Sequence, residues 1–321
     1  MHLKKHLLFI FVIIFVLGLV YFYALSDMFH PKQIASYENF TEMSEDFDAS
    51  KEITEAAKKY QGLKTQAGII KGNTKAVGKI IALTFDGMES RGNMEAILKI
   101  ITDQGWHATF FTEGVNAARN ETVIRKMKQE EQLIGNYSFV GVSKAERLQP
   151  EVLLEQFCRT QKILKLVTGH EPKLFKLYDT RYTDDLLRAA KASGLDNAVQ
   201  SDLDIYVRKL DNDAALADFL AKIQPGMIVS LQLGRPAPIK YSQKKGPDKP
   251  AVDKQPTIQE KNTIQVKDVT TIEIVKNLCN LLKEKGFTVV TVNVINANTK
   301  INEKQNTKPA EDAKDKKTVN N

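Results

Sequence analysis

A regular alternation of strand-like and helix-like segments, which begins at Lys79, limits the possible folds of this chain more than any other feature. Short apolar segments rich in β-branched residues, the pattern expected of buried strands, recur seven times. They are residues 79–86, 107–113, 132–139, 172–178, 198–204, 226–233 and 287–294. Amphipathic segments typical of helices separate most of them. Because strand–helix–strand connections join parallel strands, we predict an α/β fold in which helices cover one parallel sheet.

The number of strand units also indicates how the sheet closes and where a site would lie. Seven such units favour a barrel over an open sheet. In both arrangements, active sites lie at the carboxyl ends of the parallel strands. Residues that end the predicted strands, or directly follow them, are therefore the candidates for function.

Composition excludes several classes of protein. Hydrophobic residues make up 42% of the chain and charged residues 26%, which is ordinary for a globular protein. Only two cysteines occur, Cys158 and Cys279, so the chain is neither a disulfide scaffold nor a zinc-finger protein. Both cysteines lie in apolar helical segments, which leaves open whether they pair or stay as buried free thiols.

The excess of positive charge is concentrated in one segment. The formal net charge is +7, and residues 235–267, with eight basic and three acidic residues, supply +5 of it. This segment holds five prolines and a single aromatic residue, so we interpret it as a flexible basic insertion rather than a nucleic-acid-binding face. We likewise predict that residues 297–321 form a disordered polar tail.

The amino terminus has the pattern of a membrane anchor. Lys4 and Lys5 precede residues 7–25, an uncharged apolar run that would be about 28 Å long as a helix, close to the thickness of a bilayer core. We therefore predict that residues 1–26 form a cytoplasmic tip and an uncleaved transmembrane signal-anchor. The alternative is a cleaved signal peptide, for which the apolar run is unusually long.

This topology places the chain in the cytoplasmic membrane as a single-pass protein, with its amino terminus inside and its folded domain outside the cytoplasm. We expect residues 27–77 to form a stalk or extension without chemistry, and residues 78–296 to form the folded domain.

Several segments of that domain resemble one known family. The segments are IIALTFDGMES, ILKIITDQGWHATFFTEG, QLIGNYSF, PKLFKLYDTRYTDDLLRAAKASG and GMIVSLQL. They resemble the polysaccharide deacetylase family (NodB homology, carbohydrate esterase family 4) over nearly the whole domain. The resemblance implies a distorted (β/α)7 barrel that removes acetyl groups from chitin-like polymers, xylan or peptidoglycan.

The catalytic motifs of that family are mostly replaced in this chain. The resemblance implies that Asp86 is a vestigial general base, followed by Gly87 where the family has a metal-ligating aspartate. Tyr137 and Gly141 stand in place of the two metal-ligating histidines, and Gln232 in place of the histidine that acts as general acid.

The residues themselves lead to the same expectation. Metal-assisted amide hydrolysis needs a zinc-class ion with about three protein ligands and one position for water. His107 and His170 precede predicted strands, which puts them at the wrong end of a barrel. We therefore expect no zinc-type cofactor site.

The remaining polar residues at the strand ends suit sugar binding better than hydrolysis. Tyr137, Lys176, Tyr178, Asp202 and Gln232 are expected to line the mouth of the barrel, with Asp204 as the alternative to Asp202 because the register of this segment is open. Aromatic and amide side chains bind sugars by stacking and by paired hydrogen bonds. The alternative is a degenerate cleft filled by its own side chains.

We predict a membrane-anchored pseudoenzyme that binds cell-envelope polysaccharide or acts as a scaffold. One alternative is an active or altered carbohydrate deacetylase that uses Asp86, with a metal held by Asp86, Glu89 and Asp202. Another is a structural partner of an envelope protein, which would be bound through residues 235–267.

Overall fold

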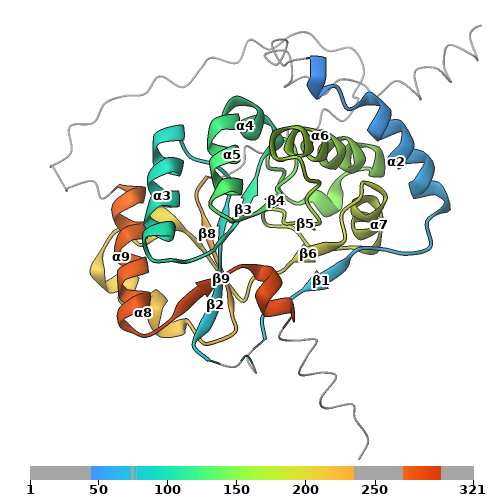
Figure 1. Ribbon diagram of the computed structural model, residues 1–321. Coiled ribbons are helices and arrows are strands. Elements are labelled where there is room, and N and C mark those ends of the chain that lie inside the picture. The colour runs from blue at the N-terminus through green and yellow to red at the C-terminus, as the bar shows by residue number, and fades with distance from the viewer. Residues whose placement is uncertain (1–44, 74–75, 77, 235–269, 298–321) are drawn as a thin grey trace, which may run out of the picture. The chain divides into compact units, whose positions relative to one another are not determined.

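The computed structural model describes residues 45–73, 76, 78–234 and 270–297 (Figure 1). The predicted anchor, the basic insertion and all but the first residue of the predicted tail lie outside these ranges. None of the helices within them is long and apolar enough to cross a membrane. The described residues from Phe47 onward belong to one compact unit.

The unit is built on a parallel sheet, as the alternation predicted. The strands are β1 (Gly68–Ile70), β2 (Ile80–Asp86), β3 (Thr109–Thr112), β4 (Leu133–Asn136), β5 (Leu174–Phe175), β6 (Asn197–Val199), β7 (Leu203–Tyr206), β8 (Ile228–Gln232) and β9 (Thr288–Val290). Their order is β1-β6-β5-β4-β3-β2-β8-β7, and β9 also pairs with β2. Every pairing between these strands is parallel. This arrangement is a partial barrel of parallel strands, consistent with a (β/α)7 fold.

Two connections bring the edges of the sheet toward each other. β6 and β7 follow one another in the chain, yet β7 pairs with β8 at the far end of the strand order. Past β1, the backbone N–H of Asn73 donates a 2.8 Å hydrogen bond to the carbonyl oxygen of Gly226, which precedes β8. These links curve the sheet and hold the ends of β1 and β8 together.

Helices surround the sheet and begin where the sequence supplies caps. They are α2 (Ser50–Gly62), α3 (Arg91–Asp103), α4 (Gly114–Arg119), α5 (Glu121–Gln129), α6 (Pro150–Thr168), α7 (Asp184–Ala192), α8 (Asp213–Lys222) and α9 (Thr271–Glu284), with short 3-10 turns at Glu45–Phe47, Ala145–Arg147 and Val207–Lys209. The side chains of Ser90, Thr183 and Asn212 accept hydrogen bonds from the first turns of α3, α7 and α8. Thr270 and Glu273 form a capping box at the start of α9. Each cap stabilises its helix by about 1 kcal/mol.

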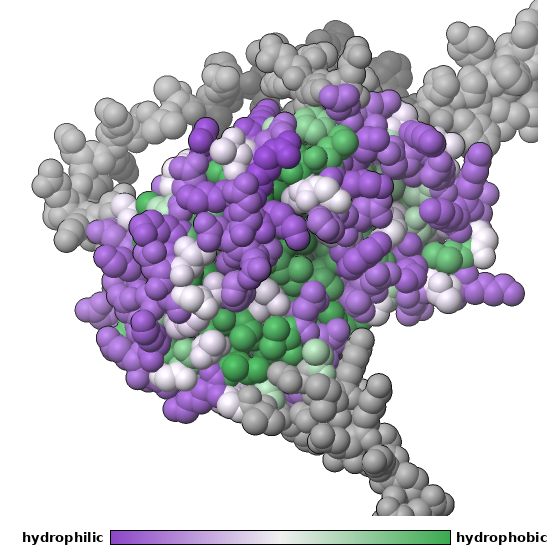
Figure 2. Space-filling view, viewed as in Figure 1, coloured by the Kyte–Doolittle hydropathy of each residue, from purple (hydrophilic) through white to green (hydrophobic). Residues whose placement is uncertain are grey.

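The core lies between the helices and the central strand β2. Every residue of β2 after Ile80 is buried, since β3, β8 and β9 all pair with this strand. The rings of Phe85 and Phe110 stack with centroids 4.9 Å apart. Trp106 is only 5% exposed and belongs to this core. In Figure 2, hydrophilic residues dominate the surface, and hydrophobic residues gather near the centre of the view, over the sheet.

Three predicted strands differ from the observed ones. The segment 172–178 gives only the two residues of β5, and the segment 198–204 divides into β6 and β7 at a bend. The segment 287–294 forms β9 as far as Val290, and residues 292–297 are helical. In the first and third segments an apolar pattern continues beyond the hydrogen-bonded ladder, whereas the bend in the second consists of the polar residues Gln200, Ser201 and Asp202.

Part of the predicted stalk, residues 27–77, packs within the compact unit. β1 pairs with β6, and Ala56 of α2 is buried in the core cluster formed with α6 and α7. Both cysteines are buried free thiols, Cys158 in α6 and Cys279 in α9. Burial raises the pKa of the Cys158 thiol to about 11 and that of Cys279 to about 12.

Candidate functional site

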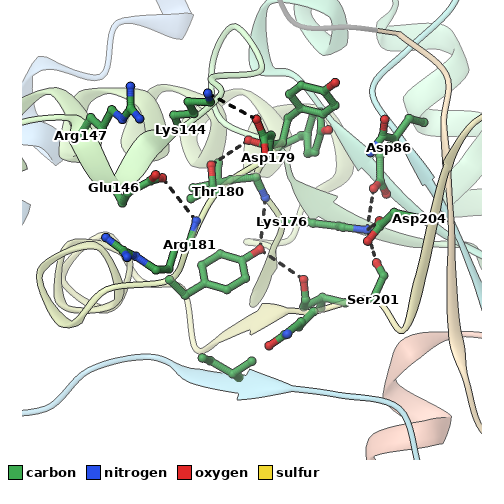
Figure 3. A pocket seen from close by; sticks show the side chains of 18 residues that line it. Asp86, Lys144, Glu146, Arg147, Lys176, Asp179, Thr180, Arg181, Ser201 and Asp204 are labelled. Carbon is green, nitrogen blue, oxygen red and sulfur yellow. Dashed lines mark hydrogen bonds and ion pairs between the residues drawn. The ribbon is translucent and has the colours of Figure 1, made fainter.

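A cleft of about 730 Å³ opens at the carboxyl ends of the parallel strands (Figure 3). Its lining comes from the ends of β2, β4, β5, β6, β7 and β8 and from the loops that follow them. The polar and charged lining residues are Asp86, Tyr137, Lys144, Glu146, Arg147, Lys176, Tyr178, Asp179, Thr180, Arg181, Tyr182, Gln200, Ser201, Asp204 and Gln232. The cleft therefore lies where the fold predicts a site.

Asp86 lies at the centre of a buried hydrogen-bond network. Its carboxylate is 1% exposed and lies 2.7 Å from the ammonium group of Lys176. Thr84 donates to Oδ1 at 2.9 Å, and Ser230 donates to Oδ2 at 2.6 Å. A buried carboxylate is stable only when it is paired in this way.

The strand register explains why these groups meet. Thr84 is paired with Ser230, and Asp86 with Gln232, in the ladder between β2 and β8. Side chains two residues apart on a strand point to the same side, so Thr84 lies beside Asp86. The sequence pattern alone gave no signal for Ser230, because its role depends on the pairing of two distant strands.

Lys176 joins Asp86 to the strand β7. The Lys176 side chain is 8% exposed, and its Nζ atom also lies 3.0 Å from Oδ1 of Asp204, a half-exposed carboxylate. It donates a third hydrogen bond to the hydroxyl of Ser201. All three N–H groups of this ammonium therefore have an acceptor.

Two loops form the rim on the other side of the cleft. The loop after β4 and the loop after β5 are linked by a parallel bridge between Ser143 and Tyr178. The backbone N–H of Lys144 donates to the carbonyl oxygen of Asp179 at 3.2 Å, and both residues have positive φ, 50° and 42°. The close pairing of the two loops holds this strained backbone in place.

Two side chains facing the cleft keep uncommitted polar groups. The ring of Tyr137 is buried, 1% exposed, and no other described residue hydrogen-bonds to its hydroxyl. Burial raises the pKa of Tyr137 well above its usual value, and the carboxylates of Asp86 and Glu113 add to the effect. The hydroxyl therefore stays protonated. The amide of Gln232 is partly exposed in the same cleft.

Glu113, which sequence reasoning missed, is the second buried carboxyl at this end of the sheet. It follows β3 and begins α4, and its Oε2 accepts from Asn116 at 3.2 Å. A Cβ at Gly87 would lie 3.0 Å from Oε1 of Glu113, so the carboxyl packs directly against Gly87. Burial raises the pKa of Glu113 to about 7, and the nearby Asp86 carboxylate contributes.

This pKa predicts a pH dependence of stability. The folded pKa of about 7 exceeds the ordinary 4.5, so the folded state binds the proton more tightly, and stability falls as the pH rises from about 4.5 through 7. Glu113→Gln removes this loss. Relative to the unchanged chain, the variant should show little difference near pH 4 and should gain about 3 kcal/mol above pH 7.

Urea unfolding across this pH range measures the difference. The exposed Glu130→Gln is the control and should follow the unchanged chain throughout. If the free energy of unfolding of Glu113→Gln changes with pH in the same way as that of the unchanged chain, the raised pKa of Glu113 is contradicted.

Most of the site residues predicted from the sequence line the cleft. Tyr137, Lys176, Tyr178 and Gln232 line the cleft with Asp86. Of the two open aspartates, it is Asp204 that does so.

The prediction that Asp202 lines the cleft was wrong. Asp202 lies in the bend before β7, where its Oδ2 accepts from the backbone N–H of Ile228 at 2.7 Å. The carboxylate is used to fix the start of β8 and is not directed at the strand ends.

Glu89 also lies away from Asp86. Its two oxygens accept hydrogen bonds from Thr271 at 2.8 Å and from Asn93 at 2.9 Å. The alternative of a metal-dependent enzyme requires Asp86, Glu89 and Asp202 to converge on one metal ion. The structure does not bring these three carboxylates together.

Part of this chain matches a known protein family. Residues 73–198, which include Asp86, Tyr137 and Lys176, match the family model described as polysaccharide deacetylase. This part of the chain is therefore similar to polysaccharide deacetylases. The match covers the part of the sheet from β2 to β5 and reaches into β6.

Two curated relatives are similar to parts of this chain. The peptidoglycan-N-acetylmuramic acid deacetylase PdaC of Bacillus subtilis is 33% identical over 99 residues, which are 30% of this chain and 21% of the relative. A peptidoglycan-N-acetylglucosamine deacetylase of Bacillus cereus is 27% identical over 96 residues, 30% of this chain and 34% of the relative. The matched segments thus span about a third or less of these relatives.

Solved structures share the fold more widely. The structure of PdaC from Bacillus subtilis has a TM-score of 0.53 at 21% identity and covers 73% of this chain and 96% of that one. A pseudoenzyme of carbohydrate esterase family 4 from Bacillus anthracis has a TM-score of 0.52 at 18% identity, covering 72% of this chain and 69% of that one. At these identities the likeness concerns the fold.

The deacetylase resemblance implies a zinc-class ion, and the residues at this site do not fit one. The Asp86 carboxylate already has three donors, and Gly87 and Gly141 have no side chain to ligate a metal. Tyr137 stays a protonated phenol. In the part of the chain that the structure describes, no group of three or more His, Cys, Asp or Glu side chains is arranged to hold a metal ion.

Proposed function

We propose that this chain is an exported, membrane-anchored protein of the deacetylase fold that binds cell-envelope glycan in the cleft and does not hydrolyse it. The observation that carries the proposal is that the buried Asp86 carboxylate already accepts from three protein donors. Lys176, Thr84 and Ser230 occupy its oxygens.

Such a carboxylate is a poor general base. A base must reach the proton that it removes and must gain from taking it up. The ammonium group of Lys176 lies 2.7 Å from the Asp86 carboxylate and, with the hydroxyls of Thr84 and Ser230, occupies the oxygens that would have to reach the proton. Hydrolysis also needs an acid for the leaving amine, and the amide of Gln232 cannot supply a proton as a histidine would.

The same cleft offers groups that suit a sugar. Tyr178 is a half-buried aromatic ring on the rim, and the hydroxyl of Tyr137 and the amide of Gln232 lie in the lining without a hydrogen-bond partner among the described residues. Aromatic faces stack on sugar rings, and hydroxyls and amides pair with sugar hydroxyls. The named relatives act on peptidoglycan, and one neighbour in fold is described as a pseudoenzyme, which supports a glycan ligand and a non-catalytic role.

The location follows from the apolar run at residues 7–25. In this proposal it anchors the chain in the cytoplasmic membrane and leaves the cleft outside the cytoplasm, where cell-wall glycan is available. The basic segment 235–267 then links β8 to α9 on the outer side of the membrane.

Sedimentation of the purified full chain with insoluble peptidoglycan tests the binding. Gln232→Ala should weaken the association by roughly tenfold, as expected for the loss of one or two hydrogen bonds. The control is Gln224→Ala, an exposed glutamine just before the start of β8, which should bind like the unchanged chain. If the unchanged chain stays in solution, it does not bind peptidoglycan. If Gln232→Ala sediments as well as Gln224→Ala, the binding does not use this cleft. Either result contradicts the proposal.

A further inference from the structure

The charged groups of the cleft are divided between its two ends. In Figure 3, Asp86, Lys176 and Asp204 lie at one end, and Arg147 and Arg181 lie at the other. Two carboxylates share the single ammonium of Lys176, so the first end keeps a net charge of −1.

The uncompensated negative charge is accessible at Asp204. Its Oδ1 accepts from Lys176, while its Oδ2 has no partner among the described residues, and the side chain is 45% exposed. Asp86, in contrast, is enclosed. A ligand that enters the cleft therefore meets a free carboxylate oxygen beside the buried network.

The hydroxyl of Tyr137 lies in the lining of the same cleft. The residue as a whole is 99% buried, and within the described ranges no protein group hydrogen-bonds to this hydroxyl. A hydroxyl can both donate and accept hydrogen bonds, so the Tyr137 hydroxyl is available to a polar ligand group beside it. Asp204 and Asp86 both act on Tyr137 electrostatically, which places the hydroxyl in the field of the same carboxylates.

The opposite end of the cleft carries positive charge and favours a neutral or negative part of a ligand. The guanidinium groups of Arg147 and Arg181 form no ion pair with another described residue, and Lys144 is already paired with Asp179 at 4.0 Å. A ligand with many positive charges would be repelled here. The cleft thus suits a ligand with one positive group at the carboxylate end.

We infer that the cleft recognises a glycan with an unsubstituted amino group, the product of a deacetylation and not its substrate. This inference rests on the proposed function, because it names the class of glycan that the cleft binds. A protonated sugar amine offers three N–H donors and a positive charge to Asp204 Oδ2 and to the Tyr137 oxygen. An N-acetyl group carries neither the charge nor the extra donors.

Two tetramers of N-acetylglucosamine test the inference by calorimetric titration of the full chain. One is fully acetylated, and the other has lost a single acetyl group. In a mildly acidic buffer that keeps the amine protonated, the tetramer with the free amine should bind at least about tenfold more tightly. This comparison uses the unchanged protein and needs no variant.

A matched pair of variants then locates the recognition. Asp204→Asn should reduce the preference for the tetramer with the free amine to about twofold or less. Asp196→Asn is the control, since Asp196 is 43% exposed, is paired with Lys191 at 2.8 Å and lies outside the cleft. It should keep the full preference.

The failures of the two proposals are distinct. If neither tetramer binds and peptidoglycan does not retain the chain, the proposed function is wrong. If both tetramers bind equally, or the acetylated one binds more tightly, the glycan site stands and the recognition of a free amine is wrong. A preference that Asp204→Asn leaves intact also overturns the assignment to Asp204.

Discussion

Lys176→Met is expected to destabilise the fold by about 3–5 kcal/mol, because it leaves the Asp86 carboxylate buried without a cation. The Lys176 side chain is 8% exposed and that of Asp86 is 1% exposed, so water does not replace the lost ammonium. Thr84 and Ser230 still donate to the carboxylate, but two neutral donors stabilise a buried charge less well than an ammonium does. Chemical denaturation of the full chain measures the loss.

A double variant and an exposed pair separate charge from packing. Asp86→Asn combined with Lys176→Met removes both charges and should recover a large part of the lost stability. Lys191→Met breaks a pair with Asp196 at 2.8 Å, but both side chains are about two-fifths exposed, so it should cost less than about 1 kcal/mol. Equal losses from Lys176→Met and Lys191→Met would show that the Asp86 pair has no special role.

Gly226→Ala should cost more than about 3 kcal/mol, because it disturbs the contact between the ends of β1 and β8. Gly226 has a φ of 83°, where an L side chain is strained by about 1–2 kcal/mol. An added Cβ would also lie 1.7 Å from the carbonyl oxygen of Asn73. That atom belongs to the backbone, so the link between Asn73 and Gly226 must break or move.

Gly286→Ala is the matched control for this prediction. Gly286 follows α9 with a φ of 76°, and the nearest atom to an added Cβ is Cδ of Lys79 at 3.9 Å. It carries the same backbone strain without the clash, so its loss should stay near 1–2 kcal/mol. Thermal unfolding of the two variants compares them directly, and equal melting temperatures would contradict a tight contact at Gly226.

The sequence predicted the elements of this fold well and its edges poorly. The strand–helix alternation located β2 to β9 and predicted helices between most of them, because the same apolar pattern recurs in unit after unit. β1 was missed, since three residues paired to a distant strand leave no periodic pattern. The bend at residues 200–202 was missed because β6 and β7, of three and four residues, are each too short to show a period of their own.

Site residues could be predicted from the sequence where they are the last residue of a single, clearly predicted strand. Asp86 ends β2 and Gln232 ends β8, and both line the cleft. Asp202 and Asp204 differ by two residues, and only the bend decides that Asp204 lines the cleft while Asp202 binds the backbone. The partners of Lys176 come from β2, β7 and the bend, so their meeting depends on the closed arrangement of the strands.

Acetate release is the most direct test of the central claim that the cleft binds glycan without hydrolysing it. The full chain is incubated with acetylated chitin and peptidoglycan fragments and excess zinc or cobalt, beside an Asp86→Asn variant. The account predicts no acetate above the level of the variant, although the same fragments bind. Acetate release by the unchanged chain that disappears in Asp86→Asn would contradict it.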